Sequence, residues 1–332
     1  MRAPTAVVLR AIGLGDMITG LPAMALLRRS LPDHRIVGAV PGQYAGILLR
    51  AGLLDEVLQT AELGPLVGAP GEPDLAVDLH GNGPPSRDLL RALGPRRLLA
   101  FVRPGEDGGP TVETSTWDDT EHEVARWCRL LREHLDGVGE PPPLWALLPT
   151  PPPVLPGATV LHPGAAAGSR RWPADRWVAV AAALAADGHR VVVTGTPGEQ
   201  QLVDVVAGPA GLQTATALDV DELFGLVAAA RLVVSGDTGV AHIASAYGIP
   251  SVVLAGPVSP ARWGPPDRPR HTALWPAPDS GYRGDPHGSE PDPVLLRTTV
   301  SDVLAGVTAV LGAGTAGGDN RLRHPPRRPS AR

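Results

Sequence analysis

The sequence predicts an α/β fold of two domains, each built on a mainly parallel β-sheet. Short apolar runs alternate with helical patterns along most of the 332 residues, and this alternation is typical of parallel sheets covered by helices. A strand, a glycine turn and a helix follow one another near Gly13–Gly15 and again near Gly236–Gly239. A proline-rich segment separates the two series, and the chain is long enough to form two cores.

The first series begins with the apolar run Thr5–Leu9, an expected strand, and continues with a helical pattern from Met17 to about Leu31. Pro22 lies inside this helix and is expected to kink it or make it irregular. Further strands are expected at His34–Val40, Asp55–Gln59, Asp74–Leu79 and Arg97–Val102, and helices at Tyr44–Ala51, Pro85–Leu93 and Glu121–Leu135. Arg103–Asp119 has no periodicity, so we expect a mobile loop there.

Proline clusters at Pro141–Pro143 and Pro151–Pro153 favour extended, semi-rigid backbone. We therefore interpret residues 141–156 as a linker between a first domain, residues 1–140, and a second, residues 157–311. Residues 312–332 include few apolar side chains that could be buried and are expected to be a disordered tail.

The second series has the same organisation. Strands are expected at Ala158–His162 and Arg190–Thr194, and helices at Pro173–Ala186, from Glu199, from Asp219 to before Arg231, and at Val294–Leu311. The stretch Leu232–Pro257 is expected to form a strand, a glycine turn, a helix that ends at Tyr247 and a second strand. Asp219 and Glu222 have the spacing of a capping box. His271–Pro293 is rich in proline and glycine and is expected to be irregular.

Composition narrows the class of protein. A net charge of −5 argues against a nucleic-acid partner. Cys128 is the single cysteine and fits a reducing compartment. The first residues contain too short an apolar run for a signal peptide, and no run reaches a membrane span. We expect a cytoplasmic protein, with peripheral contact at the inner face of the membrane left open.

The two glycine turns, near Gly13–Gly15 and near Gly236–Gly239, are the candidate ligand-binding positions. Backbone N–H groups at Thr238 and Gly239 open a helix, and the positive end of a helix suits an anion such as a diphosphate. Asp16 and Asp237 occupy equivalent places at strand ends, where open α/β sheets bind ligands. The competing interpretation is that each aspartate only caps its helix.

The sequence motifs at these two turns are similar to motifs of a known protein family. Gly236–His242, G-D-T-G-V-A-H, resembles the D-T-G-x-x-H segment of glycosyltransferase family 9, the ADP-heptose:lipopolysaccharide heptosyltransferase-like enzymes. Arg10, Gly15 and Asp16, followed by Leu21-Pro22, resemble the R-x-x-x-x-G-D…L-P opening of that family. The resemblance implies a GT-B fold, in which two Rossmann-like domains face each other across a cleft.

Further segments extend the resemblance to about Gly264. Ser169–Pro173 is similar to K-x-W-P, with Arg170 in place of the lysine. Every basic residue of this chain except histidine is arginine, and arginine binds phosphate in a planar, bidentate way. Glu199 follows a turn that resembles G-x-x-x-E, and Asp78–Asn82 resembles D-x-Q-G with His80 replacing glutamine. His162 lies in an H-P-G strand end and is as compatible with a structural role as with a functional one.

The resemblance implies a role for each matching residue. Asp16 would be the general base, since the acceptor hydroxyl must lose a proton. The donor-binding residues would be Ser169, Arg170, Glu199, Asp237, Thr238, Gly239 and His242. His80 and Asn82 would lie on the acceptor side. For Glu199, a first-turn acid that complements the helix dipole is an equally good interpretation. No metal site and no cofactor are expected.

The resemblance therefore implies an inverting, metal-independent glycosyltransferase of cell-envelope glycan biosynthesis. It would move a sugar, heptose by family default, from a nucleotide-diphosphate donor, by family default ADP-linked, to a hydroxyl of a glycan or glycolipid. Two alternatives remain at this stage. A GT-B sugar-nucleotide epimerase would convert the donor without an acceptor, and a non-catalytic protein would bind a nucleotide sugar without cleaving it.

Overall fold

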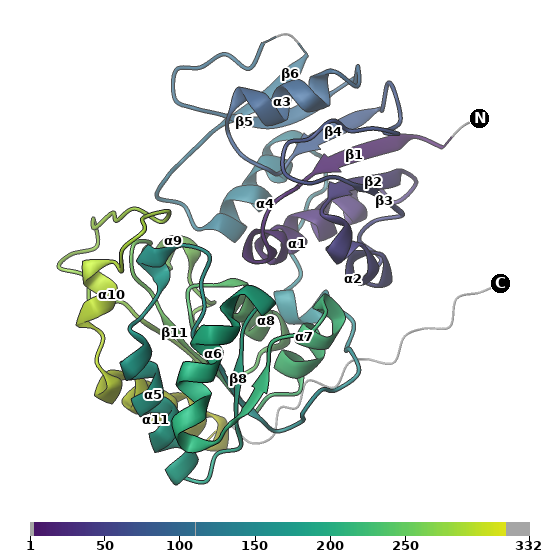
Figure 1. Ribbon diagram of the computed structural model, residues 1–332. Helices are drawn as coiled ribbons and strands as arrows, with labels where there is room; N and C mark the ends of the chain where they lie inside the picture. Colours follow the sequence, from purple (N-terminus) through teal and green to yellow (C-terminus); the bar gives the residue numbers. More distant parts are fainter. Residues whose placement is uncertain (1–2, 110, 317–332) are drawn as a thin grey trace.

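The computed structural model describes residues 3–109 and 111–316, which form two six-stranded sheets one after the other along the chain (Figure 1). Every strand pair in both sheets is parallel. The predicted α/β class with mainly parallel sheets is confirmed. In the part of the chain that the structure describes, no helix is both long and apolar enough to cross a membrane.

The first sheet has the strand order β3-β2-β1-β4-β5-β6. Its strands are β1 (Thr5–Leu9), β2 (Arg35–Val40), β3 (Glu56–Gln59), β4 (Leu75–Asp78), β5 (Leu98–Val102) and β6 (Val112–Thr116). The helices of this part are α1 (Leu14–Ser30), η1 (Gly42–Tyr44), α2 (Ala45–Arg50), α3 (Pro84–Arg91) and α4 (Glu123–His134). β1 is buried along its whole length because it pairs on both sides, with β2 and with β4.

The second sheet has the order β12-β11-β10-β7-β8-β9. Its strands are β7 (Thr159–His162), β8 (Val191–Thr194), β9 (Gln213–Ala215), β10 (Leu232–Gly236), β11 (Ser251–Leu254) and β12 (His271–Leu274). Its helices are η3 (Gly168–Arg170), α5 (Ala174–Ala186), η4 (Pro197–Glu199), α6 (Gln200–Ala207), η5 (Gly208–Ala210), α7 (Val220–Ala228), α8 (Gly239–Tyr247), α9 (Pro260–Trp263), α10 (Pro293–Arg297) and α11 (Val300–Ala316). The predicted capping box of Asp219 and Glu222 is present at the start of α7.

Both sheets have the same connectivity. The first strand of each series, β1 or β7, lies in the middle and pairs with the fourth, β4 or β10. The chain direction across the sheet reverses at this pair, and ligands of open α/β sheets bind beside the carboxyl ends of such strands. The turns that carry Asp16 and Asp237 leave β1 and β10 at this position.

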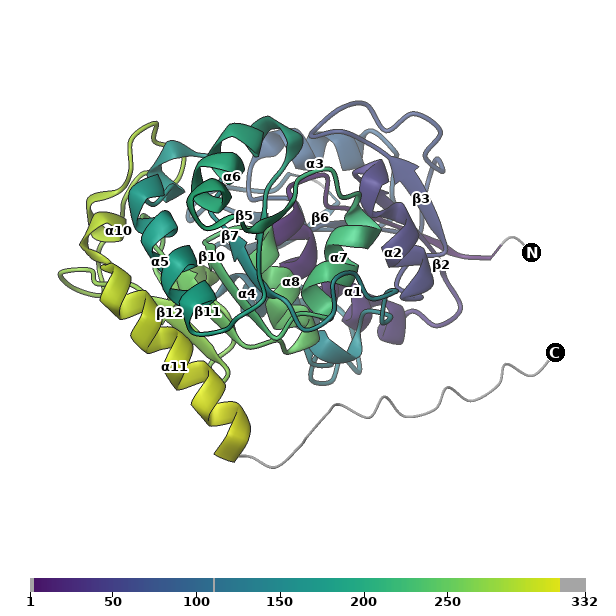
Figure 2. The ribbon, with the colours of Figure 1, turned by 60° about the horizontal axis from the view of Figure 1, so that its bottom comes forward.

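A hydrophobic core continues from one sheet region into the other through α1 and α8, which lie side by side at the junction (Figure 2). The predicted linker contributes to it. Leu148 is buried, the short helix η2 (Leu144–Ala146) packs against α8, and the Tyr247 hydroxyl donates a 2.9 Å hydrogen bond to the Pro149 carbonyl. Part of the proline-rich segment is thus packed rather than a free spacer.

The expected loop at Arg103–Asp119 is wrong in part, because Val112–Thr116 forms β6 and pairs with β5. β6 lies at the edge of the sheet, and of its five residues only Ser115 is buried. An edge strand with one buried residue has little apolar alternation, which is why periodicity did not reveal it.

Other boundaries also differ. His271–Leu274, expected to be irregular, forms β12. The terminal helix is divided into α10 and α11, because Thr299 accepts from the Asp302 N–H while Asp302 accepts from the Thr299 N–H, and this pair starts a new helix. α11 continues to Ala316, so the tail predicted from residue 312 is wrong for residues 312–316, and residues 317–332 lie outside the described part.

The first helix begins earlier than predicted, at Leu14, and continues through Pro22 without a break, so the expected irregularity is absent. Gly20, inside this helix, has a packing role. A methyl group there would lie 2.4 Å from Cδ and Nε of Arg10, whose side chain is fully buried. Arg10 cannot move aside easily, because it donates hydrogen bonds to several groups around it.

Gly20→Ala is therefore expected to destabilise the protein by about 2 kcal/mol, in the range for overpacked cores. This change in the free energy of unfolding has the opposite sign to the usual one, because alanine normally stabilises a helix interior by up to about 1 kcal/mol when it replaces glycine. Urea unfolding measures the difference. Gly312→Ala in α11 is the matched control, because a methyl group there would meet no other described residue within 4 Å. Equal stabilisation by both substitutions would show that Arg10 adapts freely.

Candidate active site

The first turns of α1 and α8 meet at the junction of the two sheet regions (Figure 2). A methyl group on Gly239 would lie 2.8 Å from the Leu14 side chain, and one on Gly15 would lie 2.9 Å from Cδ2 of His242. The glycines thus allow two helix N-termini to approach closely. Since helix N-termini carry partial positive charge, the place where they meet suits a negatively charged group.

Asp16 lies in the first turn of α1 but does not cap it. The N-cap position is Gly13, so the capping interpretation of Asp16 is wrong. Burial raises the pKa of the Asp16 carboxyl group and the nearby Glu123 raises it further, while Arg10 and, across the junction, Arg170 lower it. The structure therefore places a carboxylate of the first sheet region within electrostatic range of an arginine of the second.

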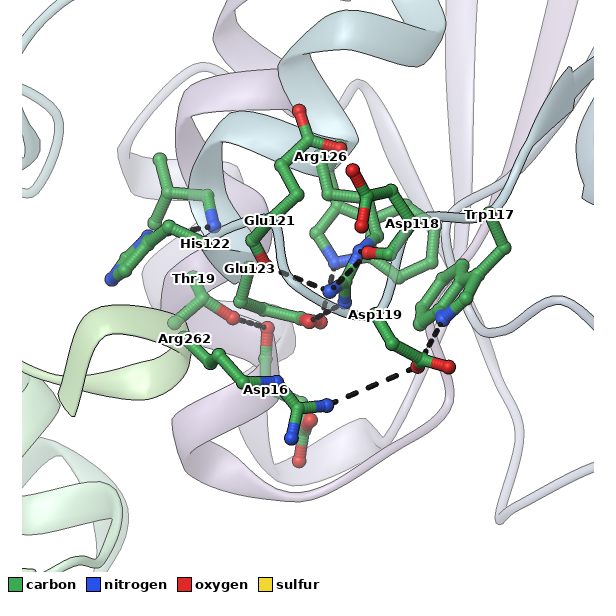
Figure 3. Close-up of polar contacts among 12 residues, drawn as sticks. Asp16, Thr19, Trp117, Asp118, Asp119, Glu121, His122, Glu123, Arg126 and Arg262 are labelled. Atoms are coloured by element: carbon green, nitrogen blue, oxygen red, sulfur yellow. Dashed lines mark hydrogen bonds and ion pairs between the residues drawn. The ribbon is translucent and has the colours of Figure 1, made fainter. Parts of the chain in front are cut away.

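Arg10 holds the backbone of Asp16 in place. Its Nε donates a 2.5 Å hydrogen bond to the Asp16 carbonyl oxygen, and Nη2 donates to the Thr19 hydroxyl at 3.0 Å. Nη1 donates to the Leu79 carbonyl. Thr19 in turn donates to the Asp16 carbonyl at 2.9 Å (Figure 3). These bonds fix the first turns of α1 and with them the position of the carboxylate.

Glu123, at the start of α4, is a residue that sequence reasoning did not single out. Its carboxylate is buried and accepts from Arg126 at 2.6 Å (Figure 3). It also accepts from Arg10 at 3.4 Å and from the Trp127 indole at 2.6 Å. In the sequence, Glu123 is recognisable only as an acidic residue near the start of a helical pattern, and this does not indicate a functional role. Glu123 and Arg10 are 113 residues apart, so the pairing depends on how α4 packs against α1.

The segment before α4 also contacts the second sheet region. His122 caps α4, accepting from the Val124 N–H, and its Nε2 lies 3.2 Å from the Gly264 carbonyl oxygen. Arg262 of α9 and Asp119 form an ion pair at 3.9 Å (Figure 3). These contacts join the start of α4, and therefore Glu123, to the loop around α9.

Asp237 is buried at the start of α8, where Thr238 and not Asp237 is the N-cap residue. The simple capping interpretation is therefore wrong for Asp237 as well. Arg170 Nη1 lies 3.4 Å from the Asp237 carbonyl oxygen. Burial raises the pKa of the Asp237 carboxyl group to about 6, and Asp16 adds to this, while Arg170 and a hydrogen bond to Trp263 oppose it.

Two hydroxyl groups of the predicted donor site lack partners within the described structure. They belong to Ser169, which is buried, and to Thr238, whose side chain does not cap its own helix. A buried hydroxyl without a hydrogen bond costs free energy. Both groups are available to a ligand atom, together with the N–H groups at the start of α8.

His242 faces the same turn of α1. It is buried, its Nε2 has no partner among the described residues, and its ring lies edge-on to Trp263 with centroids 5.0 Å apart. Burial, with His122 and Arg170 nearby, lowers its pKa to about 3, so the ring is neutral near pH 7. A neutral imidazole can donate or accept a hydrogen bond.

Glu199 lies on the second sheet in a cluster of side chains that is separate from Asp16, Arg170 and Asp237. It completes a capping box with Thr196, accepting from the Thr196 N–H at 2.8 Å and the hydroxyl at 2.9 Å, so its first-turn capping role is present. Its carboxylate also covers Gly164, where a methyl group would lie 2.2 Å from Oε1. His162 is buried beside it, and burial lowers the pKa of that histidine. Ribose binding by Glu199 stays a prediction.

His80 and Asn82 follow β4 on the first sheet. The His80 N–H donates to the buried Asp78 carboxylate at 2.9 Å, and its Nδ1 has no partner among the described residues. The Asn82 carbonyl accepts from Arg87. His80 lines a cavity of about 590 Å³ at the carboxyl edge of the first sheet. The acceptor role of both residues stays a prediction.

A larger cavity of about 650 Å³ lies between α4, α8, the loop after α9 and the proline-rich segment. Of the predicted site residues it includes only His242, and Thr19 connects it to the Asp16 turn. We place the candidate site at Asp16, Arg170 and Asp237 instead, because charge, unpartnered hydroxyls and helix N-termini converge there. Within residues 3–109 and 111–316, no three His, Cys, Asp or Glu side chains are grouped as metal ligands.

The raised pKa of Asp237 leads to a stability prediction. Its ordinary value is 3.8 and its folded value about 6, so between these pH values the folded state keeps a proton that the unfolded state has lost. The contribution of Asp237 to the free energy of unfolding therefore decreases as pH rises through this window. Asp237→Asn is expected to increase the free energy of unfolding by about 1–3 kcal/mol at pH 7.5 and by little at pH 4.

Urea unfolding at both pH values tests this expectation. Asp204→Asn, on the exposed face of α6, is the control for an aspartate that stays in contact with water. A loss of stability at pH 7.5 would contradict the expectation, and would mean that attraction to Arg170 outweighs the cost of burying the charge.

One family model and several solved structures are similar to this chain. Residues 116–279 match the model of glycosyltransferase family 9 (heptosyltransferase), while no curated protein matches the chain. The fold is similar to that of a family 9 glycosyl transferase from Veillonella parvula DSM 2008, at 17% identity over 94% of this chain and 98% of that one, with a TM-score of 0.72. E. coli ADP-heptose lps heptosyltransferase II has 18% identity over 94% and 99%, with a TM-score of 0.71. E. coli heptosyltransferase WaaC has 18% over 91% and 98%, with a TM-score of 0.69.

Proposed function

We propose that the protein is an inverting glycosyltransferase of family 9, the family whose model residues 116–279 match and whose solved structures share its GT-B fold. It moves a sugar, heptose by family default, from an ADP-linked donor to a hydroxyl group of a glycan or glycolipid, without a metal ion. The acceptor belongs to cell-envelope glycan biosynthesis, and the reaction takes place at the inner face of the membrane.

The observation that carries this proposal is the arrangement of Asp16, Arg170 and Asp237. A carboxylate with a raised pKa comes from one sheet region, and an arginine and a helix N-terminus come from the other. A general base works best when its pKa is near the operating pH. A leaving diphosphate needs positive charge where its own negative charge develops. We assign these two tasks to Asp16 and to Arg170 with the N-terminus of α8, which lie within electrostatic range of each other.

The proposed reaction is a single displacement. Asp16 accepts the proton of the acceptor hydroxyl as its oxygen attacks the anomeric carbon of the donor sugar, and the bond from that carbon to the diphosphate oxygen breaks. Arg170, the N–H groups at Thr238 and Gly239 and the hydroxyls of Ser169 and Thr238 stabilise the departing diphosphate. Glu199 binds the ribose hydroxyls, and His242 hydrogen-bonds the sugar.

The choice of an ADP-linked donor is supported by structures with the same fold. E. coli heptosyltransferase WaaC has been solved with ADP and with ADP-2-deoxy-2-fluoro heptose. TibC, at a TM-score of 0.61, has been solved with ADP-D-β-D-heptose. TibC is described as iron-containing, so the proposed metal independence of this chain needs its own test.

A thermal-shift screen with ADP-heptose, ADP-glucose, UDP-glucose and GDP-mannose tests the donor. A donor at about 100 times its Kd is expected to stabilise the fold by roughly 2.7 kcal/mol. Donor turnover is then followed with and without acceptor, before and after EDTA treatment. We expect transfer that needs an acceptor and survives EDTA. Isomerised donor without acceptor would identify an epimerase, and binding without turnover under any condition a non-catalytic protein.

A further inference from the structure

The cavity of about 590 Å³ on the first sheet lies beside the proposed base. Its walls come from the turns after β1, β2, β3 and β4, and they include Gly13, Gln43, Tyr44, Glu62 and His80. It therefore opens at the carboxyl edge of the sheet, next to the strand pair where the connectivity reverses. That edge is where ligands bind in open α/β sheets.

Two observations connect this cavity to Asp16. A methyl group on Gly13 would lie 3.4 Å from Oδ2 of Asp16, so the carboxylate is next to the cavity wall. Asp16 also contributes to raising the pKa of Tyr44, which lines the cavity, although burial is the main cause. A sugar ring in the cavity would thus have a hydroxyl group within reach of the base.

The polar groups of the wall suit uncharged hydroxyls. His80 Nδ1 has no partner among the described residues, and burial lowers the pKa of the ring, with Arg10 contributing, so the imidazole is neutral. Gln43 and Tyr44 hydrogen-bond through their side chains and add an amide and a phenol. Glu62, exposed with φ 51°, is the charged side chain that lines the described wall. Carboxylates and neutral imidazoles accept hydrogen bonds from sugar hydroxyls.

Two buried arginines of the first sheet region, Arg10 and Arg87, are already engaged. Arg10 is 1% exposed and its guanidinium donates to Asp16, Leu79, Thr19 and Glu123. Arg87 is 4% exposed and donates to the carbonyls of Asn82 and Phe101 and to Glu106. Among the described residues that line the cavity there is no arginine, and the chain contains no lysine. A carboxylate or phosphate entering the cavity would meet Glu62 without a free cation to pair with.

We propose that this cavity is the acceptor subsite, and that it selects an uncharged sugar over one that carries a carboxylate or phosphate near the accepting hydroxyl. This inference rests on the proposed transferase function and adds the chemical class of the acceptor. His80, Gln43 and Glu62 hold sugar hydroxyls, and Asp16 takes the proton of the hydroxyl that points toward α1.

Two acceptors that differ only in charge test the inference: octyl β-D-glucoside and octyl β-D-glucuronide. Binding is measured by saturation-transfer NMR on the full chain with ADP, and kcat/KM is measured with the donor found in the thermal-shift screen. We expect the glucoside to bind and react at least about tenfold better, and the preference to decrease with rising salt, because screening weakens repulsion between charges that contact water.

Glu62→Arg is expected to reduce or reverse the preference for the glucoside over the glucuronide, both in binding and in kcat/KM. Glu72→Arg is the matched control and should keep the wild-type ratio, because Glu72 is also exposed and has φ 50° but lies outside the cavity. His80→Ala should weaken the binding of both glycosides, since it removes the unpartnered ring nitrogen.

Equal or better binding of the glucuronide by the wild type would overturn the inference, and so would the same ratio in Glu62→Arg and Glu72→Arg. If neither glycoside bound at millimolar concentration while ADP-sugar binding persisted, the cavity would not be the acceptor subsite. That result differs from failure of the proposed function, in which no nucleotide sugar stabilises the chain or is consumed.

Discussion

Asp16→Asn is expected to lower kcat for sugar transfer by about 10²–10⁴-fold, the usual contribution of a general base, while the Kd of the donor changes little. The amide keeps the size of the carboxylate but cannot accept the proton. Donor affinity should persist because Arg170, Thr238 and Ser169 come from the other sheet region. Single-turnover kinetics and calorimetric titration of the donor measure the two quantities.

The pH dependence of the wild type supplies a second readout. Since burial raises the pKa of Asp16, kcat/KM should fall as pH decreases through that raised value, because the protonated carboxyl group is no longer a base. Asp175→Asn, in the first turn of α5, is the control for losing an acidic residue near a helix start. If Asp16→Asn retained more than about a tenth of wild-type turnover, Asp16 would be only a first-turn acid.

The second large effect is expected at Arg170. Arg170→Ala should lower kcat and also weaken donor binding, with a combined loss of about 10²–10³-fold in kcat/KM, comparable to removing one group that stabilises developing charge. The negative charge of the diphosphate grows as the bond breaks, so an arginine facing it interacts more strongly in the transition state than before. Removal of Arg170 also changes the site electrostatically, because Arg170 lowers the pKa of both Asp16 and Asp237.

Glu199→Ala provides the contrast. The ribose does not change during the reaction, so loss of a ribose contact should raise KM and leave kcat unchanged. Arg171→Ala is the control for Arg170, because Arg171 is exposed and its Nε donates to the Ala165 carbonyl. The same kcat for the Arg170 and Glu199 variants would contradict this division of roles. Circular dichroism of Glu199→Ala checks that loss of the capping box has not unfolded α6.

The arrangement of helices and strands followed from local patterns in most of the chain. β1 was predicted with its observed ends, and most of the predicted strands and helices lie within a few residues of their expected positions, but β9 and β12 were not predicted. Such patterns are readable because a half-buried helix or a buried strand repeats its apolar residues at a fixed interval. The pattern fails at β6, whose edge position buries one residue, and at Thr298–Thr299, where a local cap divides one apolar run into α10 and α11.

The sequence predicted which residues belong to the candidate site, but not which contacts they make. The motifs singled out Asp16, Arg170 and Asp237, and the structure brings these three within electrostatic range. Both aspartates had a capping interpretation that the sequence could not reject, because a cap is defined by backbone geometry. The observed N-caps, Gly13 and Thr238, decided the question.

By itself the sequence determined the α/β class, the two parallel sheets and the residues of the two glycine turns. Each of these features depends on patterns among residues that are close together along the chain. Only the tertiary structure decided that Glu123 pairs with Arg10 behind Asp16, that Gly20 leaves room for that arginine, and that Gly15 lies against His242. These contacts join residues 113, 10 and 227 positions apart. Partners at such separations are chosen by how whole helices and sheets pack, and no local periodicity records that choice.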